Sequence, residues 1–242
     1  MLKNPSAYQN RYGAVAKVVG VIAAFIAAME GTGLASHALH LAPMYAAIAG
    51  QVAILLVALL FALLDGEGFR SIGLAGAWKA YDAGVIPGII VVQFVGSILA
   101  VFVMMGAGLD VTGKGSAAWA LLRSFAPYSP RTFLLLALVL AALAGIGEEI
   151  LFRGYLITRL EKLGLPGWAC ILASAFIFGL AHWPGYGFWM SISKAVFFGI
   201  PTGVFFWHRR SLGPVMVAHV LMDYMAFVLV FIVGRLGPPP GL

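Results

Sequence analysis

Long apolar segments recur along the whole chain and limit the folds that it can adopt. A helix that crosses a bilayer needs roughly 20 mostly apolar residues, because each residue adds about 1.5 Å of length. Segments of about this length and character run over 14–29, 43–64, 84–107, 132–158, 167–183, 188–207 and 213–234. We therefore expect an all-α, polytopic transmembrane helical bundle with about seven spanning helices.

The amino-acid composition agrees with a membrane protein and excludes an ordinary soluble domain. Of the 242 residues, 62% are hydrophobic and 10% are charged, whereas soluble domains carry about 25% charged residues. The formal net charge is +6, but Lys and Arg collect in short connecting segments, where they set orientation. We therefore expect a multi-pass protein of a cell membrane, typical of a bacterial inner membrane. The lipid bilayer is an expected partner, and nucleic acid is not.

The basic residues also indicate which way the chain enters the membrane. They precede the first apolar segment and occupy every second loop after it: Lys3, Arg11, Lys17, Arg70, Lys79, Arg159, Lys162, Arg209 and Arg210. By the positive-inside rule, this alternation predicts a cytoplasmic N-terminus, although the third loop departs from it with Lys114, Arg123 and Arg131. The first segment could pass for a signal peptide, but residues 27–31 form a poor cleavage site, so we expect a retained helix.

The organisation along the chain predicts two halves of one structural domain. Residues 1–130 supply three spans and a loop region, in which the apolar stretch 117–125 is expected to lie along the membrane surface. Residues 131–234 supply the remaining helices, which we interpret as a catalytic core. The proline-rich tail, 235–242, is expected to be disordered because successive prolines cannot form a helix.

Ionisable side chains inside apolar segments are the most informative residues of a membrane protein. Each costs about 2.5–3.5 kcal/mol at a helix centre, so it usually faces a cavity or a partner. In this chain they gather in the C-terminal half, at Glu148, Glu149, Arg153, His182, Lys194, His219 and Asp223. This clustering predicts a polar site between helices.

The fourth apolar segment carries two adjacent acids whose directions differ. Glu149 and Arg153 are four residues apart and can form an ion pair along one helix face. Glu148 is rotated by about 100° from Glu149 and must point elsewhere. A purely structural role for both acids is the alternative, but the ion pair does not explain Glu148.

Each of the two histidines has a partner one turn away on its own segment. Phe178 and His182 share a face in the fifth segment, and His219 and Asp223 share a face in the seventh. A carboxylate one turn from an imidazole can orient the ring and set its tautomer. Taken alone, a histidine such as His182 near a helix end is more often a structural residue, and a structural contact is equally compatible with the pair of His219 and Asp223.

The three fragments together resemble a known family. The order Glu-Glu-x3-Arg, Phe-x3-His and His-x3-Asp is similar to that of the CPBP intramembrane proteases. This family includes the eukaryotic CAAX prenyl endoprotease (Ras-converting enzyme) and bacterial bacteriocin-processing and self-immunity proteins. The resemblance covers roughly residues 130–230, and the first 130 residues match only as generic membrane helices.

The resemblance implies roles for particular residues of this chain. It implies that Glu148 is the catalytic acid and that His182 helps to position the attacking water. It implies that His219 and Asp223 stabilise the oxyanion or take part in the polar site. The eukaryotic enzyme has Asn at the position of Asp223, and bacterial relatives accept either residue. Glu149, Arg153 and Phe178 would then give structural support.

The chemistry of these residue types leaves two mechanisms open. Peptide hydrolysis needs an activated water, a place for the developing oxyanion and a proton for the leaving amine. A carboxylate with two imidazoles can supply these without a metal. Alternatively, His182, His219 and a carboxylate from Glu148 or Asp223 could hold Zn²⁺ with an open position for water. We favour the metal-free route, because the first motif has no second ligand on its own helix face.

The expected function is that of an intramembrane endopeptidase acting on a membrane-associated peptide or protein. A catalytically silent scaffold or immunity protein of the same family is the first alternative. A proton-coupled transporter is the second, but many transporters contain internal repeats with paired broken helices, and this sequence has neither.

Overall fold

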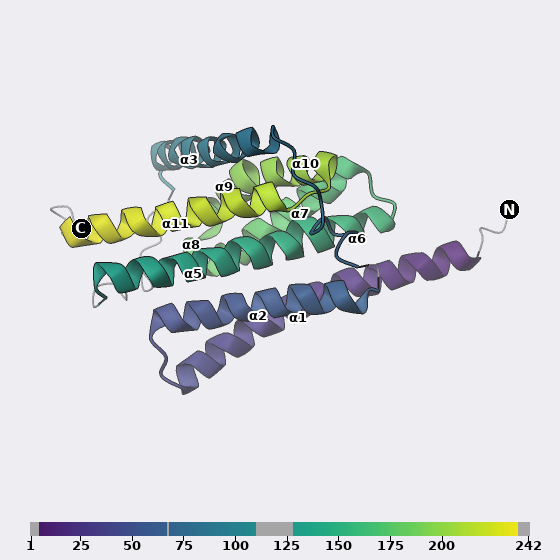
Figure 1. Ribbon diagram of the computed structural model, residues 1–242, viewed down its shortest axis with the longest axis horizontal. Coiled ribbons are helices and arrows are strands. Elements are labelled where there is room, and N and C mark those ends of the chain that lie inside the picture. Colours follow the sequence, from purple (N-terminus) through teal and green to yellow (C-terminus); the bar gives the residue numbers. More distant parts are fainter. Residues whose placement is uncertain (1–4, 67, 110–127, 237–242) are drawn as a thin grey trace.

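The computed structural model describes residues 5–66, 68–109 and 128–236, and within these ranges the chain is helical without strands (Figure 1). The N-terminal half contains α1 (Pro5–Ala38), α2 (Pro43–Leu64) and α3 (Asp82–Gly106). The C-terminal half contains α5 (Pro130–Glu148), the π-helix η1 (Glu149–Leu156), α6 (Ile157–Lys162), α7 (Gly167–Ala181), α8 (Trp183–Tyr186), α9 (Phe188–Lys194), the π-helix η2 (Ala195–Gly199), α10 (Ile200–Arg209) and α11 (Gly213–Leu236). The interfacial stretch 117–125 and the tail from residue 237 lie outside the described residues.

Six helical units of the described chain are long and apolar enough to cross a membrane. Two of them are composite: α5, η1 and α6 run on as Pro130–Lys162, and α9, η2 and α10 run on as Phe188–Arg209. The segment predicted at 167–183 forms α7, which has only 15 residues. The polytopic helical bundle is therefore confirmed, with six full-length candidates and one shorter apolar helix.

The first helix is longer than its apolar segment predicted. The sequence predicted a spanning segment over 14–29, but α1 continues to Ala38. In this more polar stretch the hydroxyl of Thr32 is satisfied within the helix, because it donates to the carbonyl oxygen of Ala28 at 2.7 Å. The connection between α1 and α2 is therefore a short turn, in which His40 has a φ of 50°.

The helices form a bundle in which the N-terminal hairpin packs against the C-terminal half (Figure 1). α1 and α2 pair with each other, and α2 also packs along α5. On its other side α5 contacts α11, which in turn contacts α3, while α7 packs against α9, η2 and α10. This arrangement puts η1 between helices of both halves of the chain.

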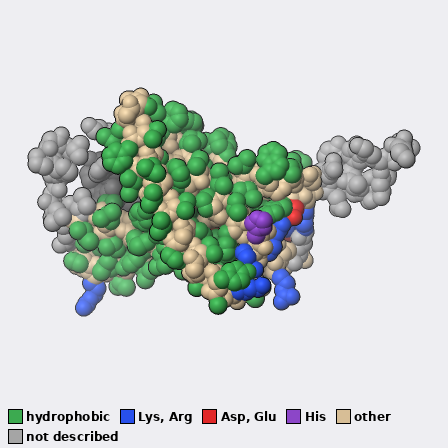
Figure 2. Space-filling view, turned by 90° about the horizontal axis from the view of Figure 1, so that it is seen from above, with side chains coloured by type: hydrophobic (Ala, Val, Ile, Leu, Met, Phe, Trp, Pro, Cys, Tyr) green, Lys and Arg blue, Asp and Glu red, His purple; other side chains and the backbone are tan. Residues whose placement is uncertain are grey.

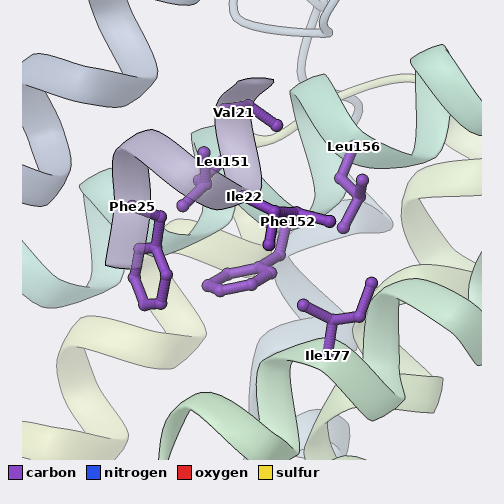
Figure 3. Close-up of a pocket in the computed structure, with 7 residues that line it drawn as sticks. All are labelled: Val21, Ile22, Phe25, Leu151, Phe152, Leu156 and Ile177. Atoms are coloured by element: carbon purple, nitrogen blue, oxygen red, sulfur yellow. The ribbon is translucent and has the colours of Figure 1, made fainter. Parts of the chain in front are cut away.

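Apolar side chains of α1 and η1 line a small cavity between the two segments. Figure 3 shows side chains of both segments around a small cavity, with one residue of α7 closing it. The lining residues are Val21, Ile22, Phe25, Leu151, Phe152, Leu156 and Ile177. The rings of Phe25 and Phe152 meet edge to face with 5.7 Å between centroids, a geometry that aromatic pairs favour. The first helix is thereby attached to the segment that carries the paired acids.

Charged side chains gather at one end of the bundle. Figure 2 shows hydrophobic side chains over most of one face, with most of the visible Lys and Arg at the end where α6 and α10 lie in Figure 1. Arg209 makes a two-pronged bond to Asp82 at 2.9 and 3.0 Å, and Arg210 makes one to Glu161. Arg159 pairs with Asp65 at 3.0 Å. The surface of the bundle is apolar along most of its length and basic at one end. This pattern is expected for a membrane protein whose basic loops lie on one side of the bilayer.

Candidate active site

Two glycines bring neighbouring helices up to the paired acids. A Cβ atom at Gly145 would lie 2.9 Å from the backbone nitrogen of Val220 in α11. A Cβ atom at Gly147 would lie 3.2 Å from Cα of Leu55 in α2. Because both glycines lack side chains, the backbones of α11 and α2 approach α5 closely, as small residues allow in membrane proteins. The sequence Gly-Ile-Gly before Glu148 therefore sets which helices face the acids.

The helix changes its geometry at the acids. α5 ends at Glu148, and the π-helix η1 begins at Glu149. The wider π turn alters the backbone hydrogen-bond pattern, and such segments often occur at functional sites. Ser174 of α7 donates its hydroxyl to the carbonyl oxygen of Phe152 at 2.7 Å. This bond ties α7, which leads to His182, to the π-helix.

Glu149 and Arg153 lie fully buried side by side. Nη1 of Arg153 is 3.0 Å from Oε1 of Glu149, so the structure contains the ion pair that the spacing predicted. The guanidinium also lies over two aromatic rings, 4.2 Å from the centroid of Phe178 and 5.2 Å from that of Phe198. Such stacking is favourable for Arg, whose planar cation is weakly hydrated. The buried guanidinium therefore faces a carboxylate and two aromatic rings.

Glu149 also reaches across to the last helix. Its Oε1 lies 2.9 Å from Nδ1 of His219 in α11. A carboxylate only accepts hydrogen bonds, so Nδ1 carries the proton and Nε2 points away from Glu149. Asp223, the partner expected from the sequence, lies on the other side of the ring, with Oδ2 3.5 Å from Nε2. The closest oriented bond to His219 therefore comes from Glu149 rather than Asp223.

His182 is held by the backbone of its own segment. Its Nδ1 lies 2.8 Å from the carbonyl oxygen of Phe178, and the two rings are in contact with 4.6 Å between centroids and their planes tilted by 53°. A carbonyl oxygen can only accept, so Nδ1 is protonated and Nε2 of the neutral ring is left as an acceptor. The spacing of Phe178 and His182 therefore both orients the ring and selects its tautomer.

Glu148 lies at the centre of this group. One oxygen, Oε1, accepts a bond from Nε2 of Gln51 at 3.0 Å. The other, Oε2, lies 3.8 Å from Nε2 of His182 and 3.9 Å from Nε2 of His219. These distances are too long for direct hydrogen bonds. Oε2 is buried and has no hydrogen-bond partner among the described residues.

The structure brings together every site residue predicted from the sequence and adds others. The four predicted catalytic residues lie close together: Glu148, His182, His219 and Asp223. The supporting residues are in contact with one another and with this group: Glu149, Arg153 and Phe178.

The sequence did not predict Gln51 as a site residue, and no role was predicted for Lys194. The ammonium of Lys194 lies 4.6 Å from the ring centroid of Tyr186, and its charge interacts electrostatically with Glu148 and Asp223. Gln51 carried one usable signal, because it is the only amide side chain in the apolar helix α2.

The residues do not fit a metal site. Within the described ranges, no group of three or more His, Cys, Asp and Glu side chains has an arrangement that could hold a metal ion. Nδ1 of each histidine is bonded, with Phe178 in one case and Glu149 in the other, which leaves Nε2 of both rings free. Metal-ligating histidines are commonly held in this way, so the argument against a zinc site rests only on the absence of such a ligand group among the described residues.

The fold and the site define a polytopic membrane protein with a buried carboxylate between two imidazoles. Residues 130–225 match the Rce1-like family, described as type II CAAX prenyl endopeptidases. This match covers less than half of the chain and supports membership of the CPBP intramembrane proteases. The matched region runs from α5 into α11 and contains Glu148, His182 and His219. Comparisons with curated proteins and with solved structures found no match.

Proposed function

We propose that this protein is an intramembrane endopeptidase in which Glu148 activates the attacking water directly. The observation that carries the proposal is the free, buried Oε2 of Glu148, with Nε2 of His182 and of His219 at 3.8 and 3.9 Å. The match to an endopeptidase family over residues 130–225 supports the reaction class. The proposed substrate is a membrane-associated peptide, with a prenylated CaaX end as the first one to test.

In the proposed reaction, a water lies between Glu148 and His182. It donates one hydrogen to Oε2 of Glu148 and the other to Nε2 of His182, both of which can only accept in this state. The water oxygen attacks the peptide carbonyl carbon as Glu148 takes its proton. That proton then passes to the amide nitrogen, the C–N bond breaks, and a carboxylic acid and an amine leave.

The developing oxyanion needs a donor, and His219 is placed to provide one. With Nδ1 bonded to Glu149, His219 donates from Nε2 when the ring is protonated. The carboxylates of Glu149 and Asp223, at 2.9 and 3.5 Å, stabilise that imidazolium. Preorganised donors of this kind are worth about 10²–10³ in rate.

The experiment compares Glu148→Gln with wild-type protein in proteoliposomes, using a quenched-fluorescent farnesylated CaaX peptide. The exchange keeps the shape of the side chain and removes the base, so turnover should fall at least about 10²-fold with unchanged melting temperature. Glu30→Gln is the matched control, because Glu30 lies exposed on α1. Wild-type turnover by Glu148→Gln would refute the proposal, and a wild-type protein that leaves the peptide intact would refute the proposed substrate.

The two histidines complete the same experiment. His182→Ala and His219→Ala should each lower turnover at least about 10²-fold, the usual scale for acid–base groups. His37→Ala is the control, since His37 lies exposed near the end of α1. Full turnover by either site variant would remove that histidine from the mechanism.

A further inference from the structure

Gln51 joins the candidate site from outside the region matched by the family. It lies on α2, and its Nε2 is 3.0 Å from Oε1 of Glu148, 97 residues away in the chain. Because an ionised carboxylate offers only acceptors, the amide must present its NH₂ group to it. A hydrogen bond to a charged group is among the stronger ones in proteins.

The backbone around Gln51 holds this contact in place. Leu55, one turn along α2, meets Gly147 so closely that a Cβ atom there would lie 3.2 Å from Cα of Leu55. Gly147 directly precedes Glu148, so this close approach of the two helices lies next to the hydrogen bond. The position of Gln51 relative to Glu148 is thus set by backbone packing and not only by a flexible side chain.

The bond divides the two oxygens of Glu148 between different tasks. Oε1 is occupied by Gln51, whereas Oε2 has no partner among the described residues and faces both imidazoles. Without a donor on Oε1, the carboxyl group could turn about its terminal bond and exchange its oxygens, since that torsion is broad.

We infer that Gln51 is a positioning residue that fixes the carboxylate of Glu148 with Oε2 directed toward His182 and His219. The inference rests on the proposed role of Glu148 and adds a residue from the N-terminal half to the catalytic machinery. Gln51 touches neither water nor substrate in this account and acts only through Glu148.

A second glutamine provides a matched control. Gln93 lies buried in α3, and its Nε2 donates to the hydroxyl of Ser97 in the same helix at 2.7 Å. Its hydrogen bond therefore stays within its own span. Replacing either glutamine by Leu removes an amide of similar size from an apolar helix, so general effects on insertion should be alike.

The first arm of the test measures the contact without turnover. The infrared carboxyl band of Glu148 is assigned by its loss in Glu148→Gln, and its frequency is compared in Gln51→Leu and Gln93→Leu. The band should shift in Gln51→Leu and stay in place in Gln93→Leu. An unshifted band in Gln51→Leu would overturn the inference whatever the activity. If Gln51→Leu does not fold, Gln51→Asn tests the same shift, because its amide is one methylene too short.

The second arm measures kcat and KM on the farnesylated CaaX peptide. Gln51→Leu should lower kcat roughly 10-fold or more with KM nearly unchanged, because the loss affects the reacting carboxylate. Gln93→Leu should match wild type in both. Wild-type kcat in Gln51→Leu beside an inactive Glu148→Gln would overturn this inference alone. An active Glu148→Gln would instead overturn the proposed function.

Discussion

Oε1 of Glu149 lies 2.9 Å from Nδ1 of His219, across 70 residues of chain. The same oxygen is 3.0 Å from Nη1 of Arg153. Glu149 therefore links the cation of its own helix to the imidazole of the last one. In the proposed mechanism this link accounts for the two adjacent acids, because Glu149 orients His219 while Glu148 faces both imidazoles.

Replacing Glu149 by Gln should damage both stability and turnover. It strands Arg153 as a buried charge, and breaking a buried pair costs about 3–5 kcal/mol. Melting temperature in detergent and turnover per folded molecule measure the two effects. Glu161→Gln is the control, because its pair with Arg210 is about 40% exposed on both sides and should be worth at most about 1 kcal/mol. Equal melting temperatures for the two variants would contradict the role of Glu149.

Removing Arg153 should affect folding more than chemistry. Arg153→Ala leaves Glu149 unpaired and empties the space over Phe178, so we expect low yield and a loss of about 3–5 kcal/mol. Turnover per folded molecule should fall much less than in Glu148→Gln. Arg70→Ala, at an exposed position, controls for the loss of a charge. A well-folded but inactive Arg153→Ala would argue for direct contact with the substrate.

The close approach at Gly145 predicts a steric effect on the site. In Gly145→Ala the new Cβ would meet Val220 in α11 at 2.6 Å from Cγ2 and 2.9 Å from the backbone nitrogen. The helix must then shift, and His219, the neighbour of Val220, must shift with it. We expect a loss of about 1–3 kcal/mol, as for overpacking in cores, together with reduced turnover.

Gly84→Ala is the matched control for that substitution. A Cβ atom at Gly84 in α3 would meet nothing within 4 Å, and Ala favours helix over Gly by up to about 1 kcal/mol. The melting temperature should therefore stay or rise. A stable and fully active Gly145→Ala would show that α11 does not depend on this contact.

Asp223 is expected to tolerate an amide. Its Oδ2 is 3.5 Å from Nε2 of His219, longer than the bond from Glu149 on the other side of the ring. Asp223→Asn keeps an oxygen acceptor there, so turnover should fall by less than about 10-fold, below the usual scale for an acid–base group. Steady-state kinetics on the CaaX peptide measure this, and a loss comparable to that of His219→Ala would assign Asp223 an essential role.

The sequence alone predicted the class of fold and the residues that meet at the site. Apolar length predicted the spans, and the four-residue spacings placed Arg153 beside Glu149 and His182 beside Phe178. These features are local, because they depend on the geometry of one helix. The short length of α7 and the extension of α1 to Ala38 are also local, but apolar character alone does not mark where a helix ends.

The contacts between distant helices could not be predicted in this way. The bonds from Gln51 to Glu148 and from Glu149 to His219 join segments 97 and 70 residues apart. They depend on which helices pack together, and Gly145 and Gly147 decide that by backbone contacts that a single sequence does not display. The π-helix at Glu149 also changes the rotation of later side chains, and no local propensity marks its position.

The central claim is that Glu148 activates water without a metal ion, and metal content of active enzyme tests it most directly. Purified wild-type protein that cleaves the CaaX peptide is analysed for zinc and other divalent metals, then incubated slowly with a strong chelator. The account predicts far less than one metal ion per chain and unchanged turnover after chelation. Stoichiometric zinc that is lost together with turnover, and that restores turnover when returned, would contradict it.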